Sequence, residues 1–330
     1  MTGAVAIRRE HLVASHDTQS AATLAELVPL RYTHARDDGL PAHVRSASAL
    51  RRFENRLVIV QDDVNALAIQ DAGGMMRAVL LPAHASGMRV FDDTLGNKRD
   101  KLDLEACVTL PDGRLIAFGS GSMPQREQLV VWSGEQGSPW VREASSLYRE
   151  LRAAVTTGDE RLNIEGAVVV GNELKLFQRG NDARGPRRAL ANAIAAVDCD
   201  AFVRWLDGGA TVDVPRVTSV TSVDLGELAG IPFSFTDAVA LDDERVVVLA
   251  CAEDSVDAIS DGAVLGCRVG LLDAHHLRLV DIVDATGEPT HLKLEGIERR
   301  GESRTEFDVA VDVDRPSAPA QLGRLSWKWY

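Results

Sequence analysis

The sequence has little that would suit a nucleic-acid or membrane partner. Lys and Arg together number 36 against 49 Asp and Glu, which gives a formal net charge of −13. A nucleic-acid-binding face needs clustered cationic side chains that displace counterions, so this excess of acid argues against such a partner. No apolar run approaches the length of a membrane-spanning helix. We therefore expect a small-molecule substrate, and neither a nucleic acid nor a membrane, as the partner.

Cysteine is scarce and has no metal-binding spacing. Cys107, Cys199, Cys251 and Cys267 are scattered along the chain without a CxxC pair. The expectation is that each is a small buried hydrophobe rather than a metal ligand or half of a disulfide. The opening segment MTGAVAIRREHLVASHD lacks the apolar core of a secretory signal, so we expect a cytoplasmic location.

Sequence motifs that are typical of particular enzyme classes are also missing. The sequence contains no GxSxG elbow, no P-loop and no HExxH helix, and none of its eight histidines stands in a recognisable triad context. Any chemistry must therefore come from side chains that the fold brings together.

The feature that is present is repetition. Five times the chain gives a strand, a tight turn and a strongly apolar strand, and further strands follow each time. This pattern predicts one all-β domain over residues 1–330, a five-bladed β-propeller. The expected blades span approximately 44–83, 102–145, 162–226, 233–285 and 292–328.

The last blade is one strand short. A strand at 27–35 is expected to close it, which would remove an exposed edge. Helix signals are few and lie at Thr18–Leu27, Ser145–Ala154 and, as a turn of helix, Ala201–Leu206.

One column of the aligned repeats carries oxygen-bearing side chains. Each of its members lies in the first strand of a repeat, the strand that lines the central channel of a propeller: Ser48, Glu105, Glu165, Thr236 and Glu295. Three glutamates on one narrow axis would repel one another, so either their pKa values rise or a cation neutralises them.

Ligands that offer only oxygen indicate a hard ion. Calcium accepts six to eight oxygens with loose geometry, so Ca²⁺ fits this column better than Mg²⁺, which is the alternative. The same column is also compatible with a water-filled polar channel, a sodium ion or a lysine partner such as Lys293.

At this column the sequence resembles the calcium-activated nucleotidases, or apyrases. These are five-bladed propellers with calcium on the axis, held by a Ser, Glu, Glu, Ser, Glu set; here Thr236 replaces the second Ser. Short sequence segments are similar as well: RLVIVQDDVNALAI with Asp62 and Asp63, FQRGN with Arg179, and LKLEGIE. The chain also resembles uncharacterised bacterial propeller proteins and phytase-like propellers.

The resemblance implies a calcium-dependent hydrolase of phosphoanhydride or phosphoester bonds. In that hypothesis Asp62 or Asp63 positions water, while Arg179 and Lys101 hold phosphate oxygens of a phosphorylated substrate. Two alternatives stay open. One is a non-catalytic propeller that binds a ligand or protein and keeps a structural cation. The other is a glycosidase or lactonase, in which Glu105 and Glu165 could serve a glycosidase as acid and base.

Overall fold

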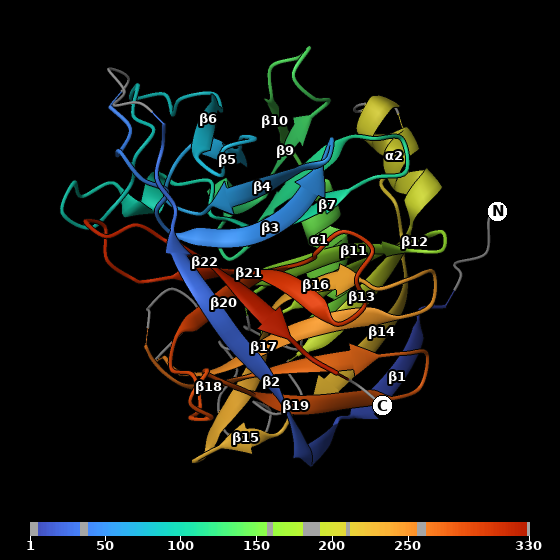
Figure 1. The fold of residues 1–330 in the computed structure, drawn as a ribbon. Coiled ribbons are helices and arrows are strands. Elements are labelled where there is room, and N and C mark those ends of the chain that lie inside the picture. Colours follow the sequence, from blue (N-terminus) through green and yellow to red (C-terminus); the bar gives the residue numbers. More distant parts are fainter. Residues whose placement is uncertain are drawn as a thin grey trace.

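Four β-sheets carry most of the regular structure, and they are arranged as sectors around a common centre (Figure 1). The computed structural model describes residues 6–33, 39–156, 161–180, 192–208, 212–255 and 262–328. Two of the sheets have four strands each. The first runs β3 (Ala47–Phe53), β4 (Arg56–Gln61), β5 (Ala66–Gln70) and β6 (Met76–Leu80). The second runs β7 (Leu104–Thr109), β8 (Leu115–Gly119), β9 (Gln128–Trp132) and β10 (Trp140–Glu143).

The third sheet has five strands because an N-terminal strand joins its outer edge. Its antiparallel part consists of β11 (Ile164–Val170), β12 (Glu173–Gln178), β13 (Ala193–Asp198) and β14 (Val217–Asp224). The first strand of the chain, β1 (Arg8–Val13), lies parallel to β14.

The fourth sheet has nine strands and consists of two halves. One half is β15 (Glu227–Leu228), β16 (Ile231–Ala240), β17 (Val246–Asp254), β18 (Ala263–Leu272) and β19 (Leu277–Val283). The other half is β20 (Lys293–Arg299), β21 (Glu306–Asp312) and β22 (Gln321–Ser326). The long strand β2 (Ser15–Pro29) joins them, lying parallel to β19 and then antiparallel to β22.

The inner strands contact one another in a closed cycle. β3 contacts β7, β7 contacts β11, β11 contacts β16, β16 contacts β20, and β20 returns to β3. Five apolar clusters of buried Val, Leu, Ile and Phe fill the spaces between neighbouring sets of strands. Apolar packing between sheets, which scales with the area removed from water, therefore holds the cycle together.

The two α-helices among the described residues both cover the same sector. α1 (Ser145–Val155) and α2 (Cys199–Gly208) bury an apolar stripe each against the cluster between the second and third sheets. Two short 3₁₀ turns, η1 (Lys98–Asp100) and η2 (Pro124–Arg126), stand in connections. Among the described residues, no helix is both long and apolar enough to cross a membrane.

The predicted helix at Thr18–Leu27 is wrong, since these residues lie in β2. The helices predicted at Ser145–Ala154 and Ala201–Leu206 are present, the second as part of the longer α2. β2 carries few buried side chains, so its own sequence does not decide its conformation. The unpaired edges of β19 and β22 supply backbone hydrogen bonds on both sides, and this tertiary pairing overrides the helix-like periodicity.

The strand that meets the edge of β22 begins earlier than predicted. Thr23–Pro29 pairs with β22, rather than a strand at 27–35, and residues 34–38 lie outside the described residues. Because the same strand also pairs with β19, the N-terminal segment ties the two halves of the nine-stranded sheet into one.

A buried ion pair lies where the inner strands meet. Arg51 of β3 donates two hydrogen bonds of 2.9 Å to the carboxylate of Asp237 in β16, and both side chains are almost fully buried. The same guanidinium donates to the carbonyls of Ala167 in β11, at 3.0 Å, and Ile297 in β20, at 3.1 Å. Asp237 also accepts the amide of Ile297 at 2.9 Å. One pair therefore cross-links four inner strands.

Removing one partner of this pair should be costly. We expect Arg51→Met or Asp237→Asn to lower the free energy of unfolding by about 3–5 kcal/mol, because the remaining group stays buried without compensation. Chemical unfolding followed by circular dichroism measures the effect. The double variant Arg51→Met/Asp237→Leu should lose less than the sum of the two single losses. The matched surface substitution Arg56→Met should change the free energy of unfolding little. Equal losses for Arg51→Met and Arg56→Met would contradict the stabilising role of the Arg51–Asp237 ion pair.

The expectation that all four cysteines are unpaired is wrong for two of them. Cys251 in β17 and Cys267 in β18 form a disulfide, and they lie directly opposite each other in the antiparallel ladder. Sequence spacing could not reveal this, because the register of two strands decides which residues face each other. Cys107 and Cys199 are free and buried, as expected.

The disulfide should stabilise the fold measurably. It closes a loop with a sequence separation of 16, for which the chain-entropy model gives about 3 kcal/mol. Cys251→Ala/Cys267→Ala, or treatment with a reductant, should lower the midpoint of chemical unfolding. Reductant should leave that double variant unaffected, and a wild-type midpoint insensitive to reductant would show that the bridge does not form.

Candidate functional site

A charged cavity of about 340 Å³ opens where the inner strands begin and the second strands end. We call it the acidic cavity. Among the described residues, eleven carboxylate side chains and seven cationic ones line it. Its carboxylates are Asp62, Asp63, Asp92, Asp93, Asp103, Glu105, Glu165, Glu253, Glu295, Asp312 and Asp314; its cations are Arg45, Lys98, Lys101, Arg126, Arg179, Lys293 and Arg315.

All five residues of the predicted column occupy the same structural position. The ladder between each inner strand and its neighbour has a register shift, and in every case the column residue is the one that is skipped: Ser48, Glu105, Glu165, Thr236 and Glu295. A bulge of this kind breaks the alternation of a strand and re-aims one side chain. The repeated bulge explains why these five positions are equivalent.

Four of the five column residues line the acidic cavity, and Thr236 does not. Thr236 is fully buried, and its Oγ1 has no hydrogen-bond partner among the described residues. Ser48 donates its hydroxyl hydrogen to the carbonyl of Leu104 at 2.5 Å. Ser48 is therefore already partnered, whereas the Thr236 hydroxyl has an unmet hydrogen-bonding capacity.

The glutamates of the column are only partly compensated by neighbours. Glu165 accepts a hydrogen bond from Asn163 at 2.8 Å and lies 3.4 Å from the Arg179 guanidinium. Glu295 lies 3.7 Å from Lys293, and its Oε2 is buried without a hydrogen-bond partner in the described part of the chain. A buried carboxylate oxygen without a partner costs free energy, so it favours a cation or a proton at this place.

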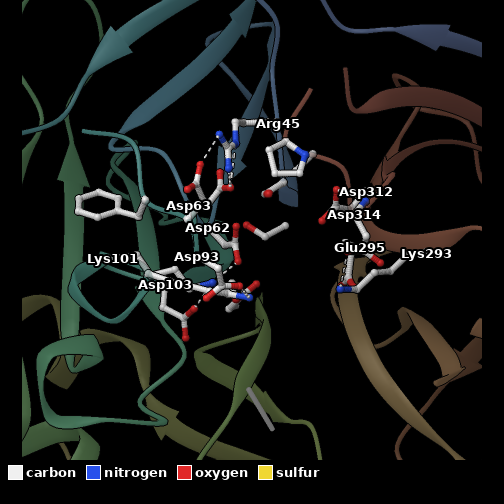
Figure 2. A pocket seen from close by; sticks show the side chains of 18 of the residues that line it. Arg45, Asp62, Asp63, Asp93, Lys101, Asp103, Lys293, Glu295, Asp312 and Asp314 are labelled. Carbon is white, nitrogen blue, oxygen red and sulfur yellow. Dashed lines mark hydrogen bonds and ion pairs between the residues drawn. The ribbon is translucent and has the colours of Figure 1, made fainter. Parts of the chain in front are cut away.

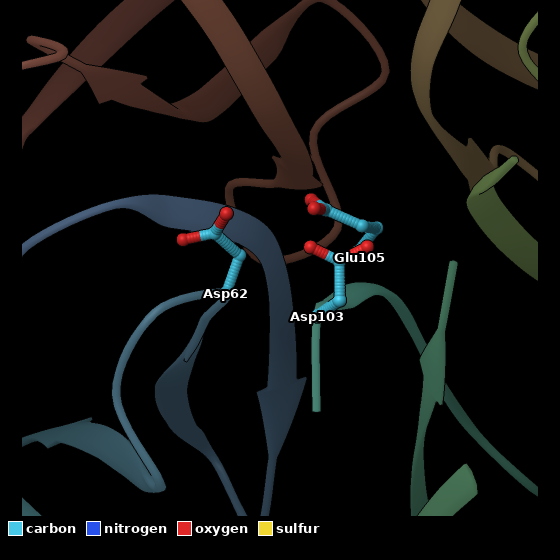
Figure 3. Close-up of side chains that lie close together, drawn as sticks. All are labelled: Asp62, Asp103 and Glu105. Carbon is cyan, nitrogen blue, oxygen red and sulfur yellow. The ribbon is translucent and has the colours of Figure 1, made fainter. Parts of the chain in front are cut away.

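Glu105 lies in a second carboxylate group. One ligand atom each from Asp62, Asp103 and Glu105 falls within 4.8 Å of the others, and Figure 3 shows the three side chains close together. Lys101 occupies this group, since its ammonium lies 2.7 Å from Asp103 and also bonds Asp62. The ammonium already supplies positive charge here, whereas Glu295 Oε2 and Thr236 Oγ1 have no hydrogen-bond partner among the described residues.

The pKa values of the column glutamates follow from this arrangement. Burial raises the pKa of Glu165 to about 7, although Arg179 acts in the opposite direction. Burial, and then the charge of Asp62, raises the pKa of Glu105 well above its usual range. Burial likewise raises the pKa of Glu295 well above normal, against the effect of Lys293. Without a bound cation, these side chains therefore keep a proton to a higher pH than an ordinary glutamate does.

The predicted catalytic residues Asp62, Asp63, Arg179 and Lys101 all line the cavity. Asp63 is held by Arg45, which donates to it at 2.8 Å and 2.5 Å. Arg179 is held between Glu165 and Glu253. Lys101 bonds Asp62 through its Oδ2, and Arg45 bonds Asp63 through its Oδ2. The Oδ1 atoms of both aspartates are buried and have no hydrogen-bond partner within the described ranges, so each keeps an oxygen available to a water molecule.

The segment from Lys101 to Glu105 is held in place by a buried network of hydrogen bonds and ion pairs. Asp103 accepts a hydrogen bond from Arg126 at 2.7 Å, and Ser120 donates to the same carboxylate. Asp103 has φ 55°, and Ser46, two residues before Ser48, has φ 45°. Non-glycine residues rarely take this left-handed conformation, so the same strained geometry before two column residues is typical of a functional rim.

Sequence reasoning missed part of the cavity wall. Asp312 and Asp314 lie with Lys293 and Glu295 across from Asp62 and Asp103 (Figure 2). Asp312 ends the second strand of the last repeat and Asp314 follows it, much as Asp62 and Asp63 follow the second strand of the first. The alignment of the repeats could therefore have predicted Asp312 and Asp314 as residues of the cavity wall. Arg45 and Asp92 carried no such signal, because they belong to connections.

Comparison with solved structures places the chain among propeller-type folds. A GH43 β-1,3-galactosidase is 8% identical over 94% of this chain and 63% of that chain, with a TM-score of 0.50. A gluconolactonase from Xanthomonas campestris is 12% identical over 93% and 97%, with a TM-score of 0.41. A virginiamycin B lyase from Staphylococcus aureus is 10% identical over 88% and 68%, with a TM-score of 0.36. At these identities the likeness concerns the fold alone.

The family is defined by sequence. Residues 43–326 match a family of unknown function, DUF6929, and the chain belongs to that family. No curated protein matches the chain.

The raised pKa values predict a pH dependence that a cation should remove. A carboxyl whose pKa is raised by folding stabilises the folded state fully below its unfolded pKa, and this contribution is lost as the pH rises through the folded value. For Glu165 the window runs from its usual 4.5 to about 7. Asp103 and Glu253 have lowered pKa values, so their contribution changes only below this window.

In chelator, the melting temperature should therefore fall as the pH rises from 5 to 8. Added Ca²⁺ should restore it, most strongly at the upper end of the range. Glu165→Gln should reduce the pH dependence in chelator, whereas Glu173→Gln on the neighbouring strand β12 should not. A melting curve with the same pH profile in chelator and in calcium would contradict this assignment.

Proposed function

We propose that this protein is a divalent-cation-dependent hydrolase of lactones, with its reaction centre in the acidic cavity. The observation that carries the proposal is the excess of carboxylates over cations in a largely buried wall, together with the unpartnered oxygens of Glu295 and Thr236. A bound cation would neutralise the excess negative charge and would also give these oxygens a partner.

The residues that would hold the ion are those of the column, Ser48, Glu105, Glu165, Thr236 and Glu295. They offer only oxygen, which suits Ca²⁺ and, as the alternative, Mg²⁺. When bound, such an ion polarises a carbonyl oxygen of the substrate.

This placement assumes five blades. The support for that count is the cycle of inner strands, the bulge that each of them carries and the apolar clusters between neighbours. The nine-stranded sheet then counts as two blades that share β2.

The charge of the cavity favours a neutral substrate over a phosphorylated one. Arg179 and Lys101, the predicted phosphate ligands, each already contact two carboxylates. A phosphate group would have to displace these partners and would add negative charge to a wall with an excess of it. A lactone brings no charge, and its carbonyl and ring oxygens are hydrogen-bond acceptors.

Asp62 is the residue that would position the attacking water. Its Oδ1, like that of Asp63, is buried without a hydrogen-bond partner among the described residues, but Asp62 also has a carboxylate oxygen within 4.8 Å of Glu105 of the column. Lys101 fixes its other oxygen. In the hydrolysis, the water oxygen bonds to the carbonyl carbon while the ring C–O bond breaks. One water proton passes through Asp62 to the departing ring oxygen, which leaves a hydroxy acid.

A glycosidase is the second candidate. Glu105 and Glu165 both line the cavity and have raised pKa values, as a general acid requires. In that reaction they act without a metal, because a ligand of the ion cannot also donate a proton.

The compartment is a separate question. The disulfide between Cys251 and Cys267 supports an oxidising compartment rather than the predicted cytoplasm, since such bridges persist mainly outside it.

A panel of substrates, combined with elemental analysis, separates these functions. The purified chain should contain about one divalent ion and hydrolyse γ- and δ-lactones, measured by proton release, and chelator should abolish turnover. Glu295→Gln should lose the ion and at least tenfold in kcat/KM, while Glu173→Gln serves as the control. Metal-free cleavage of nitrophenyl glycosides would favour the glycosidase. Phosphate release from nucleotides would favour the nucleotidase, and a bound ion without turnover would favour a binding propeller.

A further inference from the structure

A second cavity, of about 520 Å³, adjoins the acidic cavity. We call it the side cavity. The two share the walls formed by Lys293, Asp312, Asp314 and Arg315. Both volumes lie in the range of small-molecule sites. The two cavities therefore lie next to each other, on either side of this shared wall.

The side cavity has a different chemical character. Apart from the shared wall, its lining is mainly aliphatic: Val264, Leu292, Val313, Ala318 and Pro319, with Gly262, His291 and Gln321. These residues come from the start of β18, the turn before β20 and the connection between β21 and β22. The aliphatic side chains are only partly buried, so covering them with an apolar group is favourable.

The lysine of the shared wall does not supply a free charge. Lys293 lies 3.1 Å from Asp314 and 3.7 Å from Glu295, so its ammonium is already paired on both sides. A charged substituent would have to compete with these contacts, whereas an uncharged one would leave them intact.

His291 gives the side cavity one oriented polar group. Its Nδ1 lies 3.2 Å from the carbonyl of Val264, and this contact fixes Nδ1 as the donor in the neutral ring. Nε2 is then the nitrogen that can accept a hydrogen bond. The site therefore suits an apolar substituent that carries one hydroxyl or amide N–H.

We propose that the side cavity binds an uncharged, mainly aliphatic substituent of the substrate whose polar head is hydrolysed in the acidic cavity. The proposal rests on the proposed function for its reaction and adds the substrate class: lactones that bear an alkyl chain of several carbons. His291 adds a preference for a hydrogen-bond donor on that chain.

A homologous series of γ-lactones, from unsubstituted to octyl-substituted, tests this substrate class. We expect kcat/KM to rise about two- to fourfold for each methylene that enters the side cavity, and then to level off. Ala318→Trp, which fills the side cavity, should flatten the series. Ser317→Trp is the matched control, since Ser317 is exposed and lines neither cavity, and it should leave the series unchanged. His291→Phe should reduce the preference for hydroxyl-bearing chains.

The outcomes separate this inference from the proposed function. Lactone hydrolysis that does not depend on chain length would overturn the side-cavity assignment and leave the hydrolase standing. If no lactone is hydrolysed, calorimetric titration with non-reactive lactams of the same chain lengths tests the cavity directly. Tighter binding of the octyl than of the unsubstituted lactam, lost in Ala318→Trp, would support the assignment, and equal binding would overturn it.

Discussion

The ion pair between Arg51 and Asp237 is the contact on which the arrangement of inner strands depends. These strands approach one another near the axis, where their backbone groups are buried and must find partners. Arg51 supplies such hydrogen bonds to several strands at once, since it donates to an aspartate of β16 and to carbonyls of β11 and β20. Its charge is matched by one carboxylate and several carbonyl oxygens. The strands can therefore converge without leaving a buried charge unpaired.

Further along the same strands the charges are not matched in this way. The bulges re-aim Glu105, Glu165 and Glu295, and the surrounding turns add Asp62, Asp312 and other carboxylates. Lysines and arginines compensate part of this charge, as Lys101 does between Asp62 and Asp103. Burial, together with the remaining negative charge, raises the pKa values of these glutamates. In the part of the chain that the structure describes, Glu295 Oε2 and Asp62 Oδ1 are buried without hydrogen-bond partners. This imbalance is what supports the proposed cation and the proposed uncharged substrate.

Two errors of the sequence analysis have the same physical origin. The segment at Thr18–Leu27 has a helix-like pattern, but it becomes a strand because the edges of β19 and β22 bind its backbone. Cys251 and Cys267 have no characteristic spacing, but they form a disulfide because the register of β17 on β18 sets them opposite each other. Neither edge nor register can be read from the local sequence.

The sequence by itself determined which residues are equivalent. Ser48, Glu105, Glu165, Thr236 and Glu295 stand at one place in five repeats, and the structure finds each of them at the same bulge, because a repeated local sequence folds into a repeated local geometry. Only the tertiary structure decided which groups meet across repeats. Arg179, for example, pairs with Glu165 of its own sheet and with Glu253 of the next one. Their distances depend on how the sheets pack around the axis, which no single repeat encodes.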